Sequence, residues 1–264
     1  MTKLVNERAR IVGNANVGPR LHIMTLKAPQ ISSAILPGQF VHMRLPDLGE
    51  HILRRPFSVY ARNASEGTLD ILYQEVGSVT KLMPEYKGDF VELIGPIGNT
   101  WSTECKRALL VCGGVGAAPL FMLAETLKAN GVLLDVVLGA QTKDALVTRQ
   151  RYQELLGVEP SCATDDGTYG RPGFCTSIVE ERLAGGCTRD GQPYDFIAVC
   201  GPEPLMRIVS EMGEAASIRT QVSMEKRMAC GIGACLSCVV DTTGGKRRSC
   251  IDGPIFDAEE VMWR

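Results

Sequence analysis

Four cysteines near the C-terminal end of this sequence have the spacing of an iron–sulfur site. Cys230 is followed after four residues by Cys235, after two more by Cys238, and after a further eleven by Cys250. Three thiolates from one tight loop and a fourth from a later segment form the plant-type pattern that binds a [2Fe-2S] cluster. The small residues that begin at Gly231 let the backbone wrap closely and direct N–H groups at the cluster sulfurs. Because such a cluster moves one electron at a time, the pattern predicts redox chemistry.

Four cysteines also suit a structural zinc site, which is the main alternative. Zinc ribbons usually pair their ligands as two short knuckles, whereas here three cysteines cluster and one stands alone. We therefore favour the iron cluster over zinc, and disulfides less than either. The other six cysteines are scattered, several of them in apolar runs where a thiol behaves as a small hydrophobe. We expect these six to be packing residues: Cys105, Cys112, Cys162, Cys175, Cys187 and Cys200.

Composition excludes several classes of protein. The chain has 264 residues, a formal net charge of -2 and 45% hydrophobic residues, which is ordinary for a globular protein with one or two cores. It lacks the dense positive charge that a nucleic-acid binder needs, so no nucleic-acid partner is expected. We find neither the apolar core of a signal peptide nor a run of about 18 apolar residues. A cytoplasmic location away from the membrane is therefore expected.

Three regions are expected to position the chemistry. Residues 1–103 carry short apolar or alternating runs separated by Gly, Pro, Asn and Asp, which predicts an antiparallel β-barrel, with a β-sandwich as the alternative. Residues 104–221 alternate buried strands with helical stretches, which predicts a parallel α/β sheet. Those helical stretches are 117–130, 144–156 and 203–216. Residues 222–264 form a small cluster domain, so the fold class is α/β plus β.

The barrel region offers groups that suit a flavin dinucleotide. Arg55 can neutralise a pyrophosphate, and Ser58 can form hydrogen bonds to the flavin or its ribityl chain. Tyr73 provides a flat apolar surface, and the turn 77–80 offers backbone and hydroxyl groups to phosphate oxygens. Taken alone, the same residues also fit a surface arginine and core aromatics on a strand.

Two strand ends in the α/β region suit a nicotinamide dinucleotide. Glycines at a junction of strand and helix let a phosphate approach the backbone and the helix N-terminus. The first junction contains Gly113, Gly114, Gly116 and Pro119, a variant of the dinucleotide glycine turn. The second contains Cys200, Gly201 and Pro202. Cys200 either faces the nicotinamide ring or simply packs the strand end.

Three segments, RPFS, GGVGAAP and CGPEPLM, resemble the ferredoxin-NADP reductase superfamily over roughly residues 3–215. With MEKRMACGIGACLSC and CIDGPIF added, the chain resembles the electron-transfer subunits of two-component, NAD-linked (class 1B) dihydroorotate dehydrogenases. This resemblance implies FAD, a [2Fe-2S] cluster and NAD. It also implies an FMN-containing catalytic partner that oxidises dihydroorotate to orotate in pyrimidine biosynthesis, with two copies of each subunit. The four cysteines are then the cluster ligands.

The same resemblance implies a set of FAD contacts on this chain. They are Arg55, Pro56, Phe57, Ser58, Leu72, Tyr73, Gln74, Val79 and Thr80. Two positions depart from the family pattern, because Gln74 stands where a basic residue is common and Val79 where glycine is usual. A family segment, 164–170, carries the acidic pair Asp165 and Asp166, which would repel a 2′-phosphate and favours NAD over NADP.

No general base is needed in this chain, because proton abstraction from the substrate would belong to the partner. We accordingly expect His22, His42 and His51 to be ordinary surface or boundary residues of the barrel. Two other functions stay open. One keeps both cofactors in another complex, such as a transhydrogenase, sulfite reductase or hydrogenase, and the other is a redox-sensing module. The apolar side chains of the cluster region either contact the partner or pack beneath the loop: Met228, Ile232 and Leu236.

Overall fold

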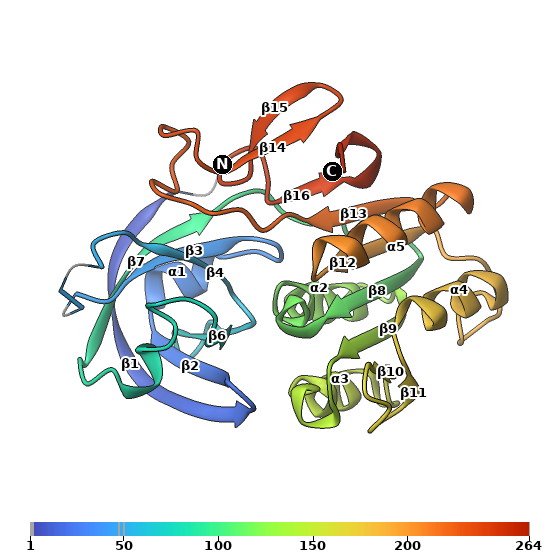
Figure 1. Ribbon diagram of the computed structural model, residues 1–264, viewed down its shortest axis with the longest axis horizontal. Coiled ribbons are helices and arrows are strands. Elements are labelled where there is room, and N and C mark those ends of the chain that lie inside the picture. Colours follow the sequence, from blue (N-terminus) through green and yellow to red (C-terminus); the bar gives the residue numbers. More distant parts are fainter. Residues whose placement is uncertain (1–2, 47, 50, 264) are drawn as a thin grey trace.

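The N-terminal third folds into a strongly curled antiparallel sheet, a half-barrel (Figure 1). The computed structural model describes residues 3–46, 48–49 and 51–263. The strand order is β4-β3-β7-β1-β2-β6-β5. The strands are β1 (Val5–Gly18), β2 (Leu21–Lys27), β3 (Phe40–Arg44), β4 (Arg55–Ser58), β5 (Ala61–Asn63), β6 (Thr68–Gln74) and β7 (Phe90–Ile97), with one short helix, α1 (Pro29–Ala34).

Alternation along these strands separates an interior from an exterior. In β7, for example, Val91 and Leu93 are fully buried in the barrel core, while their neighbours are partly exposed. The prediction of an antiparallel barrel domain is therefore confirmed, in the form of a curled sheet.

The central part is a sheet of seven strands in the order β11-β10-β9-β8-β12-β13-β16. All neighbours are parallel except β13 and β16, which run antiparallel. The strands are β8 (Arg107–Gly113), β9 (Leu133–Ala140), β10 (Ser161–Thr164), β11 (Arg171–Pro172), β12 (Phe196–Cys200), β13 (Arg219–Ser223) and β16 (Ile255–Asp257).

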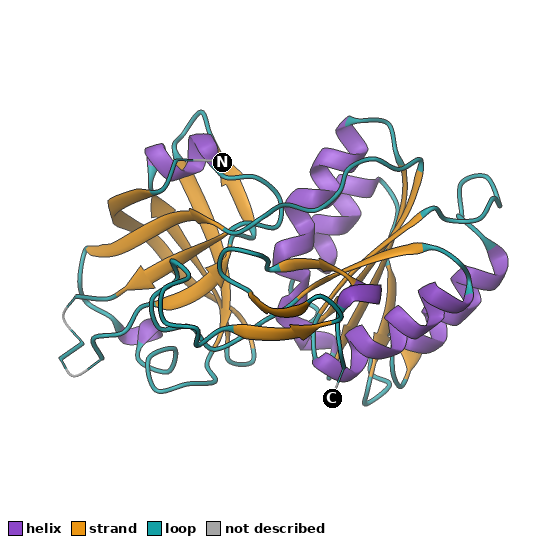
Figure 2. Cartoon of the chain, turned by 90° about the horizontal axis from the view of Figure 1, so that it is seen from above, coloured by secondary structure: helices purple, strands orange, loops and turns teal. Residues whose placement is uncertain are grey.

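Helices cover both faces of this sheet (Figure 2). They are α2 (Ala118–Ala129), α3 (Arg149–Leu156), α4 (Thr176–Gly185) and α5 (Glu203–Ala215). Residues of α2 and α3 pack on one face with Leu110, whereas α4 and α5 pack on the other with Leu109 and Val111. Burial on both faces explains why the strands are continuously apolar. The predicted helices correspond to α2, α3 and α5, while α4 was not predicted.

The C-terminal segment crosses from the α/β sheet to the barrel, passing over both (Figure 1). It contains the cysteine loop and a hairpin of β14 (Val239–Thr242) and β15 (Gly245–Arg248). It then returns as β16 to pair with β13. The predicted boundary at 221/222 falls inside β13, so this segment leaves the sheet only after Ser223. In the part of the chain that the structure describes, no helix is long and apolar enough to cross a membrane.

The barrel and the α/β sheet meet through aromatic and charged side chains. Arg151 of α3 forms an ion pair with Asp70 of β6, with 3.2 Å between Nη1 and Oδ2. Its guanidinium lies 4.8 Å from the ring centres of both Tyr60 and Phe121. These contacts join residues of the barrel to residues of the α/β domain.

Candidate functional site

A cleft of about 330 Å³ lies where the barrel, the α/β sheet and the C-terminal segment meet. Most of the flavin contacts implied by the sequence line it. From the barrel come Arg55, Pro56, Phe57, Ser58, Leu72, Tyr73, Gln74 and Thr80. The curl of the sheet explains this gathering, because β4 and β6 lie at or near its opposite edges and are brought into contact.

Tyr73 is held in one orientation by three neighbours. Its hydroxyl donates to Asn14 Oδ1 at 3.0 Å, and its ring stacks on His22 with 5.1 Å between ring centres. Phe57 meets it edge-on at 6.4 Å. Burial raises the pKa of Tyr73 to about 12, so the phenol stays protonated. The residue therefore offers the cleft a fixed, uncharged aromatic surface.

The turn after β6 is ordered by Thr80. Its hydroxyl oxygen accepts the N–H groups of Val76 at 3.0 Å and Gly77 at 2.8 Å. Val79, in contrast, is buried in the barrel core and is not among the residues that line the cleft. The structure thus brings the Thr80 side chain to the site and leaves only the backbone of Val79 for a contact.

Glycine is needed at the end of β8 for two different physical reasons. A Cβ on Gly116 would lie 2.4 Å from the carbonyl oxygen of Cys200, and one on Gly113 would lie 2.6 Å from Leu205. Both glycines are thus required by close packing against β12 and α5. Gly114 has a φ of +55° and open space around it, so it is the glycine whose backbone a ligand can approach.

The N-terminal end of α2 faces the cleft through two residues that sequence reasoning missed, Val115 and Ala118. A helix N-terminus presents unpaired N–H groups and a favourable dipole to an anion. Pro119 is buried, and its carbonyl accepts the Trp101 indole N–H at 3.2 Å. Its role in the structure is to start the helix.

Cys200 lies at the end of β12, fully buried, with its Sγ 3.9 Å from the carbonyl oxygen of Ser223. Burial raises the pKa of its thiol well above the usual value. Ser223 lines the cleft, whereas Cys200 is not one of the lining residues. The structure thus favours the packing interpretation for this cysteine. Gly201 follows with its Cα against Gly113, and Pro202 precedes the first turn of α5.

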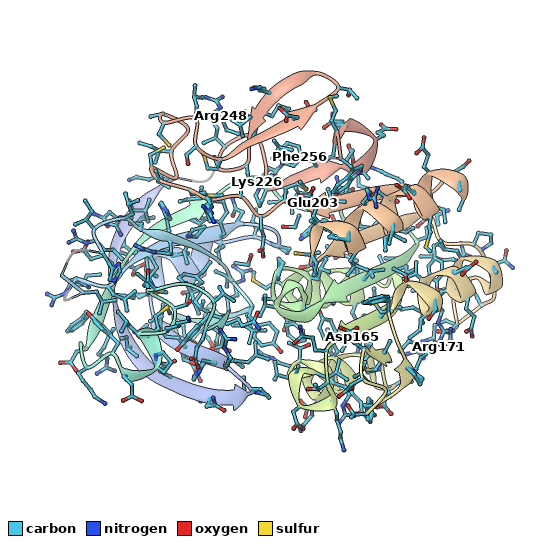
Figure 3. All side chains as sticks on the ribbon, in the orientation of Figure 1. Asp165, Arg171, Glu203, Lys226, Arg248 and Phe256 are labelled. Atoms are coloured by element: carbon cyan, nitrogen blue, oxygen red, sulfur yellow. The ribbon has the colours of Figure 1, made fainter. Side chains whose placement is uncertain are left out.

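Sequence reasoning missed the wall that the C-terminal segment supplies. This wall consists of Ser223, Met224, Glu225, Lys226, Met228 and Pro254, with Phe40 beside it. Lys226 is held by an ion pair with Glu203 of α5 at 3.6 Å, and both are labelled in Figure 3. Most of these residues lie in the runs MEKRM and CIDGPIF, but their position over the cleft follows from tertiary folding.

The acidic pair lies at the carboxyl end of β10, away from the residues that line the cleft. Asp166 Oδ1 accepts the N–H of Thr168 at 3.0 Å and its hydroxyl at 2.7 Å, and these bonds lower its pKa. Asp165 is exposed (Figure 3). Both carboxylates are exposed, and Asp165 has no side-chain hydrogen bond to the described residues that would hold it in place.

The four predicted ligand cysteines lie on one loop and just after the hairpin that follows it. Cys238 and Cys250 pack in one buried group, whereas Cys230 is partly exposed and Cys235 is exposed. Although burial acts in the opposite direction, the N–H groups of the loop and the Cys235 thiol lower the pKa of Cys230 to about 6. Within the described ranges, no three His, Cys, Asp or Glu side chains surround a single metal ion. Four thiolates from one loop and a later segment are the ligand set that a [2Fe-2S] cluster takes.

Glycines allow the loop to lie against its neighbours. A Cβ on Gly231 would be 2.5 Å from Nδ1 of His42, and one on Gly233 would be 2.4 Å from Ile251. Both glycines have positive φ, at +69° and +81°. Arg248 closes the other side, donating to the Gly233 carbonyl at 3.3 Å. The small residues are therefore needed for packing as well as for wrapping around a cluster.

Apolar side chains around the loop divide into two groups. Ile232 and Leu236 are 53% and 63% exposed, which supports a contact surface. Met228 instead packs with Phe40 against the buried thiols of Cys238 and Cys250. Packing beneath the loop is thus confirmed for Met228, whereas contact with a partner stays a prediction for Ile232 and Leu236.

Two of the three histidines differ from the expectation of surface or boundary residues. His22 is only 6% exposed, with Nε2 2.7 Å from Glu75 Oε1, whereas His51 is partly exposed. His42 is fully buried beneath the cluster loop. The expectation of a surface or boundary residue is wrong for His42, because the C-terminal segment folds back over β3 and covers it.

Family models match two parts of the chain. Residues 225–262 match the iron-sulfur cluster binding domain of dihydroorotate dehydrogenase B, and residues 110–211 match an oxidoreductase NAD-binding domain. The electron transfer subunit of dihydroorotate dehydrogenase B (NAD(+)) from Bacillus pumilus is 34% identical over 95% of this chain and 96% of its own. Its counterpart from Caldanaerobacter subterraneus is 38% identical over 97% and 98%. This chain belongs to the dihydroorotate dehydrogenase B electron transfer subunit family.

Family membership confirms the predicted fold class and the predicted cofactors FAD, [2Fe-2S] cluster and NAD. It also confirms an oxidoreductase subunit that transfers electrons between NAD and a partner. A solved NADH-dependent reduced ferredoxin-NADP oxidoreductase, studied for flavin-based electron bifurcation, aligns over 97% of this chain and 90% of its own, with a TM-score of 0.85 and 30% identity. A ferredoxin NADP+ reductase from Neisseria gonorrhoeae shares the fold, with a TM-score of 0.64, 16% identity, and 80% and 91% covered.

Proposed function

We propose that this chain passes electrons between NAD+ and a partner subunit that oxidises dihydroorotate to orotate. When bound, FAD would convert between the hydride of NADH and the single electrons that a [2Fe-2S] cluster carries. One observation carries this proposal. Phe40 and Met228 line the cleft and also pack in the group that contains Cys238 and Cys250, so a single layer of side chains separates the two sites.

The residues of the cleft have distinct tasks in this proposal. Arg55 neutralises the FAD pyrophosphate, Ser58 and Thr80 offer hydroxyl groups, and Tyr73 flanks the flavin ring. Contacts by Pro56, Phe57, Leu72, Gln74 and the backbone of Val79 complete the set. The nicotinamide dinucleotide would bind across the strand ends at Gly114 and Gly201. The iron ligands would be Cys230, Cys235, Cys238 and Cys250.

The partner is proposed to be an FMN-containing catalytic subunit, present with this chain in two copies each. Its docking surface would include the exposed Ile232, Leu236 and Ile251 around the cluster loop. Docking there brings the partner to the thiolate ligands, of which Cys235 is exposed. We further propose a cytoplasmic location, because none of the ten cysteines forms a disulfide and a reducing compartment keeps thiols in that state.

Anaerobic coexpression with a tagged dihydroorotate dehydrogenase catalytic subunit from the same source tests this function. We expect a stable complex that reduces NAD+ when dihydroorotate is supplied. The isolated chain should oxidise NADH with an artificial acceptor and form no orotate. Orotate formation by the isolated chain would refute the division of labour between the subunits.

A second function is favoured by the 30% identity and 0.85 TM-score to the NADH-dependent reduced ferredoxin-NADP oxidoreductase structure. In that case the chain would serve a transhydrogenase complex, with the same cofactors and a different partner. Binding of FAD and iron together with failure to bind the dihydroorotate subunit would select this alternative. Reduced ferredoxin and NADP+ would then be the substrates to test with the copurifying chain.

A further inference from the structure

A completely buried histidine lies between the barrel and the cysteine loop. His42 is 0% exposed and sits on β3 two residues after Phe40. Neither Nδ1 nor Nε2 makes a hydrogen bond to any residue that the structure describes. Burying an imidazole without partners is costly, and an apolar side chain would fill the same space without that cost. The position therefore requires an explanation other than packing.

The ring is placed against both halves of the proposed redox site. On one side lies Gly231, where an added Cβ would be 2.5 Å from Nδ1, so only glycine fits there. On the other side, β3 pairs with β4, and His42 is directly opposite Pro56, which lines the cleft. The ring thus contacts the cysteine loop at Gly231, between the proposed ligands Cys230 and Cys235. It does so from β3, whose partner strand β4 forms part of the cleft wall.

Two backbone groups lie near enough to become hydrogen-bond partners of the ring: those of Arg54, just before β4, and of Cys230. Neither bond is formed in this structure. An imidazole always carries at least one N–H, so the ring has a donor to offer the loop.

We propose that His42 is a positioning residue for the cluster: its ring bears on the loop at Gly231 and, with the cluster in place, its N–H would bond to the loop backbone at Cys230 and hold the loop at its distance from the cleft. The inference rests on the proposed function, since it assigns the loop to a [2Fe-2S] cluster. Hydrogen bonds from neighbouring residues that orient a ligand also control how firmly the metal is held. The expected role is thus mechanical and does not involve proton transfer.

His42→Leu and His42→Gln, prepared as the full chain with both cofactors, test the proposal. Leucine fills the space without polar atoms, whereas glutamine restores a donor and an acceptor. His51→Leu is the control, since His51 lies in a partly exposed loop. The readouts are FAD and iron per chain, the rate at which a chelator removes iron, and the electron paramagnetic resonance g values of the reduced cluster.

We expect His42→Leu to keep its FAD, to lose iron about tenfold faster and to show shifted g values, as for loss of one hydrogen bond. His42→Gln should recover most of the wild-type iron lifetime, and His51→Leu should match the wild type. An unchanged iron lifetime with unchanged g values in His42→Leu would overturn the proposal. So would loss of FAD along with iron, because the ring would then support the barrel, or a glutamine variant no better than leucine. Wild-type protein lacking iron would instead refute the proposed function itself.

Discussion

The side chain of Asn99 and the backbone of Ile255 form a reciprocal pair of hydrogen bonds. Asn99 Nδ2 donates to the Ile255 carbonyl at 2.8 Å, and its Oδ1 accepts the Ile255 N–H at 2.9 Å. The Asn99 backbone N–H also donates to Gly253 at 2.6 Å. Asn99 lies in the connection from β7 to β8, and Ile255 begins β16, five residues after Cys250. The connection between the first two domains therefore holds the segment that carries the last ligand.

Asn99→Ala should lower the free energy of unfolding by about 1–2 kcal/mol, because the polar backbone groups of buried Ile255 lose their partners. Urea unfolding measures the change. Iron should also dissociate faster than in the wild type. Asn130→Ala, at an exposed helix end, is the matched control and should change stability by less than about 0.5 kcal/mol. Equal stability of the two variants would show that the reciprocal pair contributes nothing.

Cys235→Ser should abolish the iron cluster and retain FAD, because the ligand lies on a loop outside the flavin cleft. Iron and acid-labile sulfide analysis, with the visible spectrum, checks this result. Cys105→Ser, which removes a thiol far from the loop in sequence, should keep about wild-type iron. Detection of one zinc and no sulfide in the wild type would restore the zinc alternative.

Asp165→Arg should improve the use of NADPH relative to NADH by about tenfold in kcat/KM, because an exposed carboxylate that repels a 2′-phosphate becomes a cation that attracts it. Steady-state kinetics with an artificial acceptor measures the ratio. Asp89 is an exposed residue of the barrel, and Asp89→Arg should leave the ratio of NADPH to NADH kcat/KM unchanged. An unchanged ratio in Asp165→Arg would place the adenosine end of the dinucleotide elsewhere.

Asp135→Asn should destabilise the fold by about 1–3 kcal/mol at pH 7. Burial raises the pKa of Asp135, but hydrogen bonds from Thr188 and Tyr194 outweigh it and leave the pKa below the usual 3.8. Because the folded-state pKa is depressed, the carboxylate stabilises the fold at neutral pH, and this contribution is lost as the pH falls through the folded-state value.

The stability difference between wild type and Asp135→Asn should accordingly be full at pH 7 and should shrink below about pH 4. Urea unfolding at pH 7, 5 and 3 measures this difference. The exposed Asp144→Asn should show little effect at any of these values. A stability difference that grows as the pH falls would contradict a lowered pKa of Asp135 in the folded state.

Sequence patterns predicted much of the fold and part of the site. The uniform apolar character of β8 and the spacing of the cysteines are local properties, so they identified the parallel sheet and the thiolate loop. The segment RPFS also lines the cleft as expected. The glycines of the β8 turn were recognised from the sequence, but the reason for them was recognised only in part. Gly116 is required by its contact with Cys200, a residue distant in the sequence.

The sequence by itself determined the cofactor chemistry, because ligand type and spacing are written along a short stretch of chain. Only the tertiary structure decided how the sites are joined. The return of the C-terminal segment over β3 buries His42, places Met228 over the cleft and pairs β16 with β13. The first two of these contacts join residues separated by more than a hundred positions, and their free energy comes from packing surfaces that no local pattern specifies.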